Sequence, residues 1–187
     1  MAVLEGMDKI LNIVNKFLEQ FNATAYWNED FEARCESREI GFTLAVSEDS
    51  LLEFTNDAYS RYVGIEADPF LWLFLHELGH VMTDNEWTEE ELEYFEYQKE
   101  MLTEIEDDQL RADWYHAIPD EFMATRWAAE FMMDYPEVVA DFWDELQSAI
   151  MEFYFIHNLS NDEDDEDLDE EAAIICTTEF GTTWYRK

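Results

Sequence analysis

The sequence predicts a mostly helical α+β fold with a small N-terminal sheet. Glycine and proline are scarce, at 5 and 3 of 187 residues, which argues against a loop-rich or all-β architecture. Several segments repeat apolar residues every three or four positions, as amphipathic helices do, and one short segment alternates as a strand does. The hydrophobic share of 48% is too high for a disordered acidic chain. We therefore expect one compact domain.

The first elements are a helix and two strands. Residues 3–21 form an amphipathic helix in this interpretation, because their apolar side chains share one face, namely Leu4, Met7, Ile10, Leu11, Val14, Phe17, Leu18 and Phe21. In residues 40–46, apolar side chains alternate with smaller ones, which predicts a strand. A weaker strand signal covers residues 23–27.

Four helices are expected after the strands. One begins at Asp68-Pro69, where Asp can cap the first N–H groups and Pro fits the first turn. Its first turns, Phe70 to Leu75, are apolar on every side, so protein should enclose them. A polar, exposed helix should cover residues 89–105, another should start near Pro119, and a long one should start at Pro136.

The C-terminal part changes in composition. Residues 162–171 read DEDDEDLDEE, and the repulsion between these charges favours an extended, solvated segment. A calcium loop of the EF-hand type is less well matched, because the run lacks the required glycine. We divide the chain into a domain at 1–159, an acidic linker at 160–172 and a C-terminal segment at 173–187, whose apolar residues favour docking on the domain.

The charge of the chain restricts its partners. Its 47 Asp and Glu against 10 Lys and Arg give a net charge of -37, which excludes direct nucleic-acid binding because phosphate contacts need basic residues. The longest apolar stretch is too short to cross a membrane, and the N-terminus lacks a secretion signal. A cytoplasmic protein with basic partners is expected.

The strongest chemical signal is His76-Glu77-Leu78-Gly79-His80. On a helix, His76 and His80 lie one turn apart on the same face and can bind one zinc ion. Glu77 then lies beside the open coordination position, where it can act as general base toward water. Two structural helix histidines are the alternative, but two unliganded imidazoles on so apolar a helix would be costly to bury.

A catalytic zinc site needs a third protein ligand, and Glu121 is the best candidate. It follows Pro119 closely, and the small residues on its stripe, Ala124, Thr125 and Ala128, allow a close approach to the helix that carries Gly79. In the alternative interpretation, Glu121 merely favours the positive end of its helix dipole. Asp84, four residues after His80, is a second candidate ligand or orienting group.

Residues 69–133 resemble the ImmA/IrrE-type metallopeptidases, which combine HELGH with a later Glu-x-x-Ala-Asn-x-Phe-Ala-Ala stretch; here Glu121 to Ala129 read EFMATRWAA. The resemblance implies a minimal zincin-like, gluzincin-like domain whose small sheet packs on the HExxH helix. It also implies zinc bound by His76, His80 and Glu121, with Glu77 as the catalytic acid/base. The implied setting is the cytoplasm of a bacterial or phage-infected host cell.

The chain departs from the family pattern at Thr125, where the family usually has Asn, and in the segment before HELGH. A Thr125 hydroxyl can still orient a ligand imidazole. A peptidase also needs a group that stabilises the oxyanion, and Tyr115, His116 and His157 are candidates. His116 is expected in a loop, where an exposed polar residue is the alternative interpretation.

These patterns predict a zinc-dependent metallopeptidase that hydrolyses peptide bonds of a protein or peptide substrate. The resemblance implies regulatory DNA-binding proteins as one substrate class, and a negative field would attract such basic proteins. The alternative is an acidic decoy that mimics DNA on a zincin-like fold and occupies a basic partner. The two hypotheses differ in whether Glu77 is needed.

Overall fold

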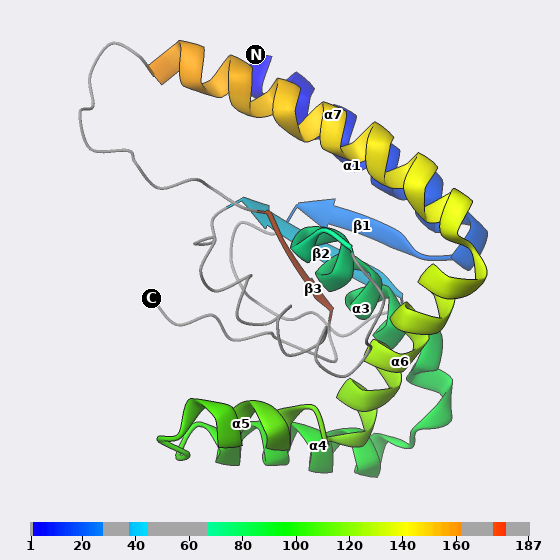
Figure 1. Cartoon of the computed structure of the whole chain (residues 1–187), viewed down its shortest axis with the longest axis vertical. Helices are drawn as coiled ribbons and strands as arrows, with labels where there is room; N and C mark the ends of the chain where they lie inside the picture. Colours follow the sequence, from blue (N-terminus) through cyan, green and yellow to red (C-terminus); the bar gives the residue numbers. More distant parts are fainter. Residues whose placement is uncertain (1, 28–37, 45–66, 162–173, 179–187) are drawn as a thin grey trace.

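The computed structural model describes residues 2–27, 38–44, 67–161 and 174–178 (Figure 1). Within these ranges the chain is mostly helical with a small sheet, as predicted. The α-helices are α1 (Ala2–Leu18), α3 (Pro69–Thr83), α4 (Glu89–Leu102), α5 (Asp108–Tyr115), α6 (Pro119–Asp134) and α7 (Pro136–Asn161). Short 3-10 helices, η1 (Glu19–Phe21) and η2 (Asp84–Glu86), follow α1 and α3. The strands are β1 (Thr24–Trp27), β2 (Glu39–Leu44) and β3 (Ile174–Thr178).

Helix α3 is the centre of the fold. It starts at Pro69, and the carbonyl of Asp68 accepts a hydrogen bond from the Trp72 N–H at 3.0 Å. Every residue from Leu71 to Val81 is buried, which confirms the predicted enclosure for Leu71 to Leu75. The side chain of Phe70 lies outside the described residues. Burial on all sides places the polar residues of the HELGH motif inside the molecule, where each of them needs a partner.

Helices α1 and α7 run side by side along one edge of the molecule (Figure 1). The apolar stripe predicted for the N-terminal helix faces the core, where Phe17 stacks on Phe142 with ring centroids 4.0 Å apart. Phe17 also meets Phe74 of α3 at 5.9 Å. The aromatic contacts therefore join both long helices to the helix that carries the motif.

The sheet has the strand order β1-β2-β3. Strands β1 and β2 are parallel, with Thr24 opposite Glu39, whereas β2 and β3 are antiparallel, with Ile40 opposite Thr178. The Asn15 side chain of α1 accepts from the Ala25 N–H at 2.7 Å and donates to its carbonyl at 3.2 Å, which ties β1 to α1. Strands β2 and β3 contact α3. The two strand predictions are confirmed as far as Leu44, and residues 45 and 46 lie outside the described residues.

Helices α4 and α5 form a hairpin at the end of the molecule away from α1 and α7 (Figure 1). Helix α4 begins with a capping box, in which Thr88 Oγ1 accepts from the Glu91 N–H at 3.3 Å and Glu91 accepts from the Thr88 N–H at 2.8 Å. Helix α5 was not predicted. His116 lies in the turn that follows α5, as expected, but it is buried. The alternative interpretation of an exposed polar residue is therefore wrong.

Other predictions fall on parts that the structure leaves out. Residues 162–173, most of the acidic linker, and residues 179–187 lie outside the described residues. The division into domain, linker and C-terminal segment stays a prediction.

None of the helices in the described part of the chain combines the length and apolarity that a membrane crossing requires.

Candidate metal centre

The two histidines of the motif face the same point inside the protein. His76 and His80 are 1% and 2% exposed, and their Nε2 atoms lie 3.2 Å apart. Their rings are nearly perpendicular, with an interplanar angle of 88°. Both imidazoles direct Nε2 to one position, which confirms the prediction that the two histidines lie on the same face of the helix.

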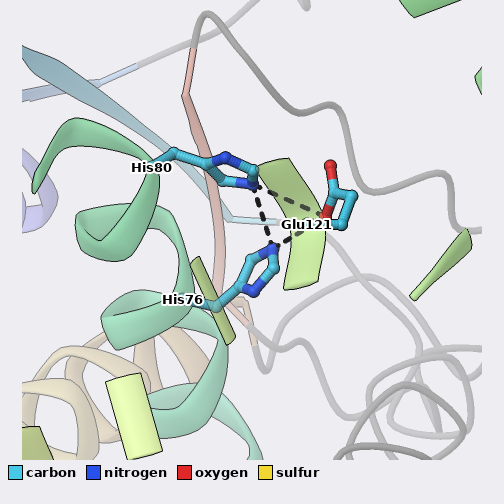
Figure 2. Close-up of side chains that lie close together, drawn as sticks. All are labelled: His76, His80 and Glu121. Atoms are coloured by element: carbon cyan, nitrogen blue, oxygen red, sulfur yellow. Dashed lines mark hydrogen bonds and ion pairs between the residues drawn. The ribbon is translucent and has the colours of Figure 1, made fainter. Parts of the chain in front are cut away.

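Glu121 reaches the same position from α6 (Figure 2). Its Oε2 atom lies 3.1 Å from His76 Nε2 and 3.5 Å from His80 Nε2. Two ligands of a tetrahedral zinc ion, each at the usual bond length, lie about 3.3 Å from one another. The three ligand atoms therefore have the spacing of a metal site. This buried group could hold a metal ion.

The close approach of α6 to α3 depends on Gly79. A Cβ atom at this position would lie 2.4 Å from the carbonyl oxygen of Ala124 and 2.8 Å from its Cα. Any side chain would therefore push the α6 backbone away. The glycine and the small residue opposite it bring Glu121 within reach of the histidines, as the sequence pattern predicts.

Thr125 of α6 contacts the other side of the His76 ring. Its Oγ1 atom lies 3.0 Å from His76 Nδ1, and both residues are buried. When Nδ1 donates its proton to Thr125, Nε2 keeps the lone pair that a metal ion needs. The hydroxyl thus orients the imidazole where the resembled family usually has an amide.

A buried lysine that the sequence did not reveal completes the surroundings of Glu121. Lys99 of α4 is 5% exposed, and its Nζ lies 2.8 Å from Glu121 Oε1. The same ammonium donates to Asp120 Oδ2 at 2.9 Å and to Glu96 Oε1 at 2.9 Å. Asp120 is also buried. Two adjacent buried carboxylates therefore share one cation.

These contacts set the charge of the ligand groups. Burial alone would raise the pKa of Glu121, but Lys99 and His80 bring it well below its usual 4.5. Burial would lower the pKa of His80, yet Glu121 raises it above its usual 6.5. Burial would also lower the pKa of Lys99, which Glu121 and Asp120 instead raise. Glu121 is therefore a carboxylate, as a metal ligand must be.

Glu77 and Tyr115 lie next to this group. Glu77 is fully buried, and its charge raises the pKa of both His80 and Tyr115. Burial, followed by the charge of Glu121, holds the pKa of the Tyr115 hydroxyl well above 10. Tyr115 is therefore a neutral phenol that can donate a hydrogen bond beside the metal ligands.

The remaining candidates have other positions. His116 packs its ring edge-on against Tyr115, with centroids 5.6 Å apart, and does not belong to the three-residue group. Asp84 lies in η2 and is also outside that group. His157 lies in α7, but its side chain is outside the described residues.

Comparisons with known protein families, with curated proteins and with solved structures find no match. The buried His76, His80 and Glu121 on two helices are consistent with a metal site of the HExxH type. The resemblance to the ImmA/IrrE-type peptidases therefore rests on the motif residues alone.

Proposed function

We propose that this protein is a zinc-dependent metallopeptidase related to the ImmA/IrrE type. The observation that carries the proposal is the convergence of two imidazole nitrogens and one carboxylate oxygen at the spacing of zinc ligands. Three protein ligands leave one position open, as catalytic zinc sites do. The buried acid that directly follows a ligand, Glu77, supports peptidase chemistry over purely structural metal binding.

His76, His80 and Glu121 would hold the zinc ion, which would supply Lewis-acid polarisation of a peptide carbonyl. The chain's own residues handle the protons. Glu77 accepts a proton from the attacking water and passes it to the leaving amine. Tyr115, a neutral phenol beside Glu121, donates a hydrogen bond to the oxygen that becomes negative. Thr125 keeps the His76 ring oriented throughout.

The proposed substrate is a basic protein, with DNA-binding regulators as the class that the family resemblance suggests. A net charge of -37 attracts basic chains and repels nucleic acid. Helix α4 displays part of this charge, since Glu89, Glu90 and Glu93 are exposed. A regulator released from DNA would therefore approach the protein more readily than one that is bound.

Two measurements test the proposal. Elemental analysis of the purified protein should find about one zinc per chain, and removal of zinc by a chelator should abolish cleavage of basic peptides. Glu77→Gln should keep the zinc and lower cleavage at least about 100-fold. Glu93→Gln makes the same charge change on the surface and should retain activity. Full activity of Glu77→Gln would refute the peptidase mechanism.

The charge also supports a second function, an acidic decoy that binds a basic partner without cleaving it. In this case Glu77→Gln would protect the partner as well as the original chain does. Binding would also weaken steeply with added salt, because surface charges are screened. The same variant therefore separates the two functions. Glu77→Gln should lose its effect on the partner if the chain is a peptidase, and should keep it if the chain is a decoy.

A further inference from the structure

Lys99 differs from the other polar residues of its helix. Helix α4 is rich in acids that face solvent, whereas Lys99 is turned inward and is almost completely buried. A long, charged side chain is rarely buried unless it is paired. The residues that pair with Lys99 therefore indicate the role of this buried charge.

The two oxygens of Glu121 have different partners. Oε1 forms the ion pair with Lys99 at 2.8 Å, while Oε2 faces the Nε2 atoms of His76 and His80. A carboxylate can bind a metal ion through one oxygen or through both. With Oε1 held by an ammonium, Oε2 alone is directed toward the histidines.

The geometry points to Lys99 as a positioning residue that limits Glu121 to one metal-binding oxygen and keeps a further coordination position free for substrate. This inference rests on the proposed function, because it assumes a metal ion between His76, His80 and Glu121. A cation so close to the ligands also repels a metal ion. Lys99 thus weakens metal binding while it preserves an open site.

A merely structural role for Lys99 predicts a different outcome. Lys99 also neutralises Asp120, which is buried next to Glu121. If neutralisation were its whole contribution, Lys99→Met would destabilise the fold and loosen the metal site. The positioning role predicts instead that the variant binds metal more tightly and with more ligand atoms.

Lys99→Met is therefore compared with the original chain in two assays. Zinc affinity, measured by competition with a chelator, should increase about tenfold or more, because a cation that repels the metal ion has been removed. With cobalt in place of zinc, the visible absorption should weaken as Glu121 becomes bidentate and the coordination number rises. Lys16→Met removes the same charge from an exposed site on α1 and should change neither result.

A second variant tests the same inference if Lys99→Met does not fold. Lys99→Met combined with Asp120→Asn removes one buried acid together with the lysine, so that fewer unpaired charges remain. It should show the same tighter zinc binding and the same change in the cobalt spectrum. Asp120→Asn alone leaves the pair between Lys99 and Glu121 and should keep the original spectrum.

The outcomes separate the inference from the proposed function. An original chain that binds one zinc but cleaves no peptide refutes the peptidase, and the cobalt spectra still test Lys99. A folded Lys99 variant with unchanged spectrum, or with weaker zinc binding, overturns the positioning role whether or not the chain is a peptidase.

Discussion

Helices α3 and α4 are neighbours in the chain but have opposite surroundings. In α3 the whole run from Leu71 to Val81 is buried. In α4 three residues are buried, Phe95, Lys99 and Leu102, and acids cover much of the rest. Each helix nevertheless supplies charged or polar groups to the same site, because His76 and His80 come from α3 and Lys99 from α4.

The two helices show that the composition of a helix determines whether a buried polar residue can be recognised from the sequence. On an apolar helix, each polar side chain must be paired inside the protein, so the motif of α3 is conspicuous. On an acidic helix, one lysine resembles a partner for surface charges, although Lys99 is the most deeply placed charge of α4. We therefore expect substitutions in α3 to be more destabilising than substitutions in α4.

The largest difference in stability between the two helices should appear when an aromatic ring is removed from each. Phe74→Ala empties a fully buried position among aromatic rings and should lower the free energy of unfolding by about 3–5 kcal/mol. Tyr97→Ala removes a side chain that is 56% exposed and should change it by less than about 0.5 kcal/mol. Urea denaturation of both variants measures the difference. Similar losses would contradict the contrast.

Gly79→Ala should be the next most damaging change. The new Cβ would meet the Ala124 carbonyl oxygen, and such overpacking costs about 1–3 kcal/mol, or more where backbone must shift. This exceeds the gain of about 1 kcal/mol in helix propensity. Zinc affinity should fall as well, since Glu121 moves with α6.

The second substitution Ala124→Gly should not rescue Gly79→Ala, because the obstructing atoms belong to the backbone of Ala124. Thermal unfolding with and without zinc measures both effects. A Gly79→Ala chain as stable as the original would show that α6 can retreat without cost.

Thr125→Val tests the support that α6 gives to α3. The substitution keeps the shape but removes the oxygen that faces His76 Nδ1, so zinc affinity should fall about 10- to 100-fold. Thr125→Ser retains the hydroxyl and should lose much less. Chelator competition measures these affinities, and equal values for the Val and Ser variants would exclude the orienting role.

The last prediction concerns the pH dependence of zinc binding. Zinc needs a neutral imidazole, and Glu121 holds the pKa of His80 above 6.5 against the lowering effect of burial. Zinc affinity should therefore rise with pH until this raised pKa is passed, by up to about tenfold per pH unit. Zinc titrations in steps from pH 5 to 9 measure this dependence. A flat profile would contradict the raised pKa.

The folding stability of the metal-free protein should also depend on pH, and the contribution of His80 should fall as pH rises. A raised pKa in the folded state stabilises the fold fully below the unfolded value of 6.5, and this contribution is lost as pH rises through the raised pKa. The lowered pKa of Glu121 stabilises the fold above 4.5, and this contribution is lost as pH falls through the lowered pKa. Both contributions are complete between pH 4.5 and 6.5.

Much of the site could be predicted because its residues follow local rules. The spacing of His76 and His80 fixes their common face, and Pro119 fixes the start of the helix that carries Glu121. The small residues of α6 indicated a close helix contact, which the structure shows at Gly79. Apolar periodicity likewise predicted α1 and α7, and the Asp68-Pro69 start signal predicted α3.

The rest depended on tertiary contacts. Helix α5 was missed because it contains no fully buried residue, and its apolar Leu110 and Trp114 point outward. Asp107, which accepts from the Leu110 N–H at 2.9 Å, was the available signal for its start. No local pattern marks a lysine as buried, so Lys99 became visible only when α4 was placed against α6.

The position of β3 has a consequence for how the chain is made. Strand β2 is an inner strand because β3, which is synthesised last among the described elements, pairs along its second side. On the ribosome, both histidines and Glu121 emerge long before that partner, and until then β2 is an open edge that can pair with foreign strands. Such distant pairing forms slowly. The topology therefore predicts that β2 gains its second strand partner only after β3 has left the ribosome.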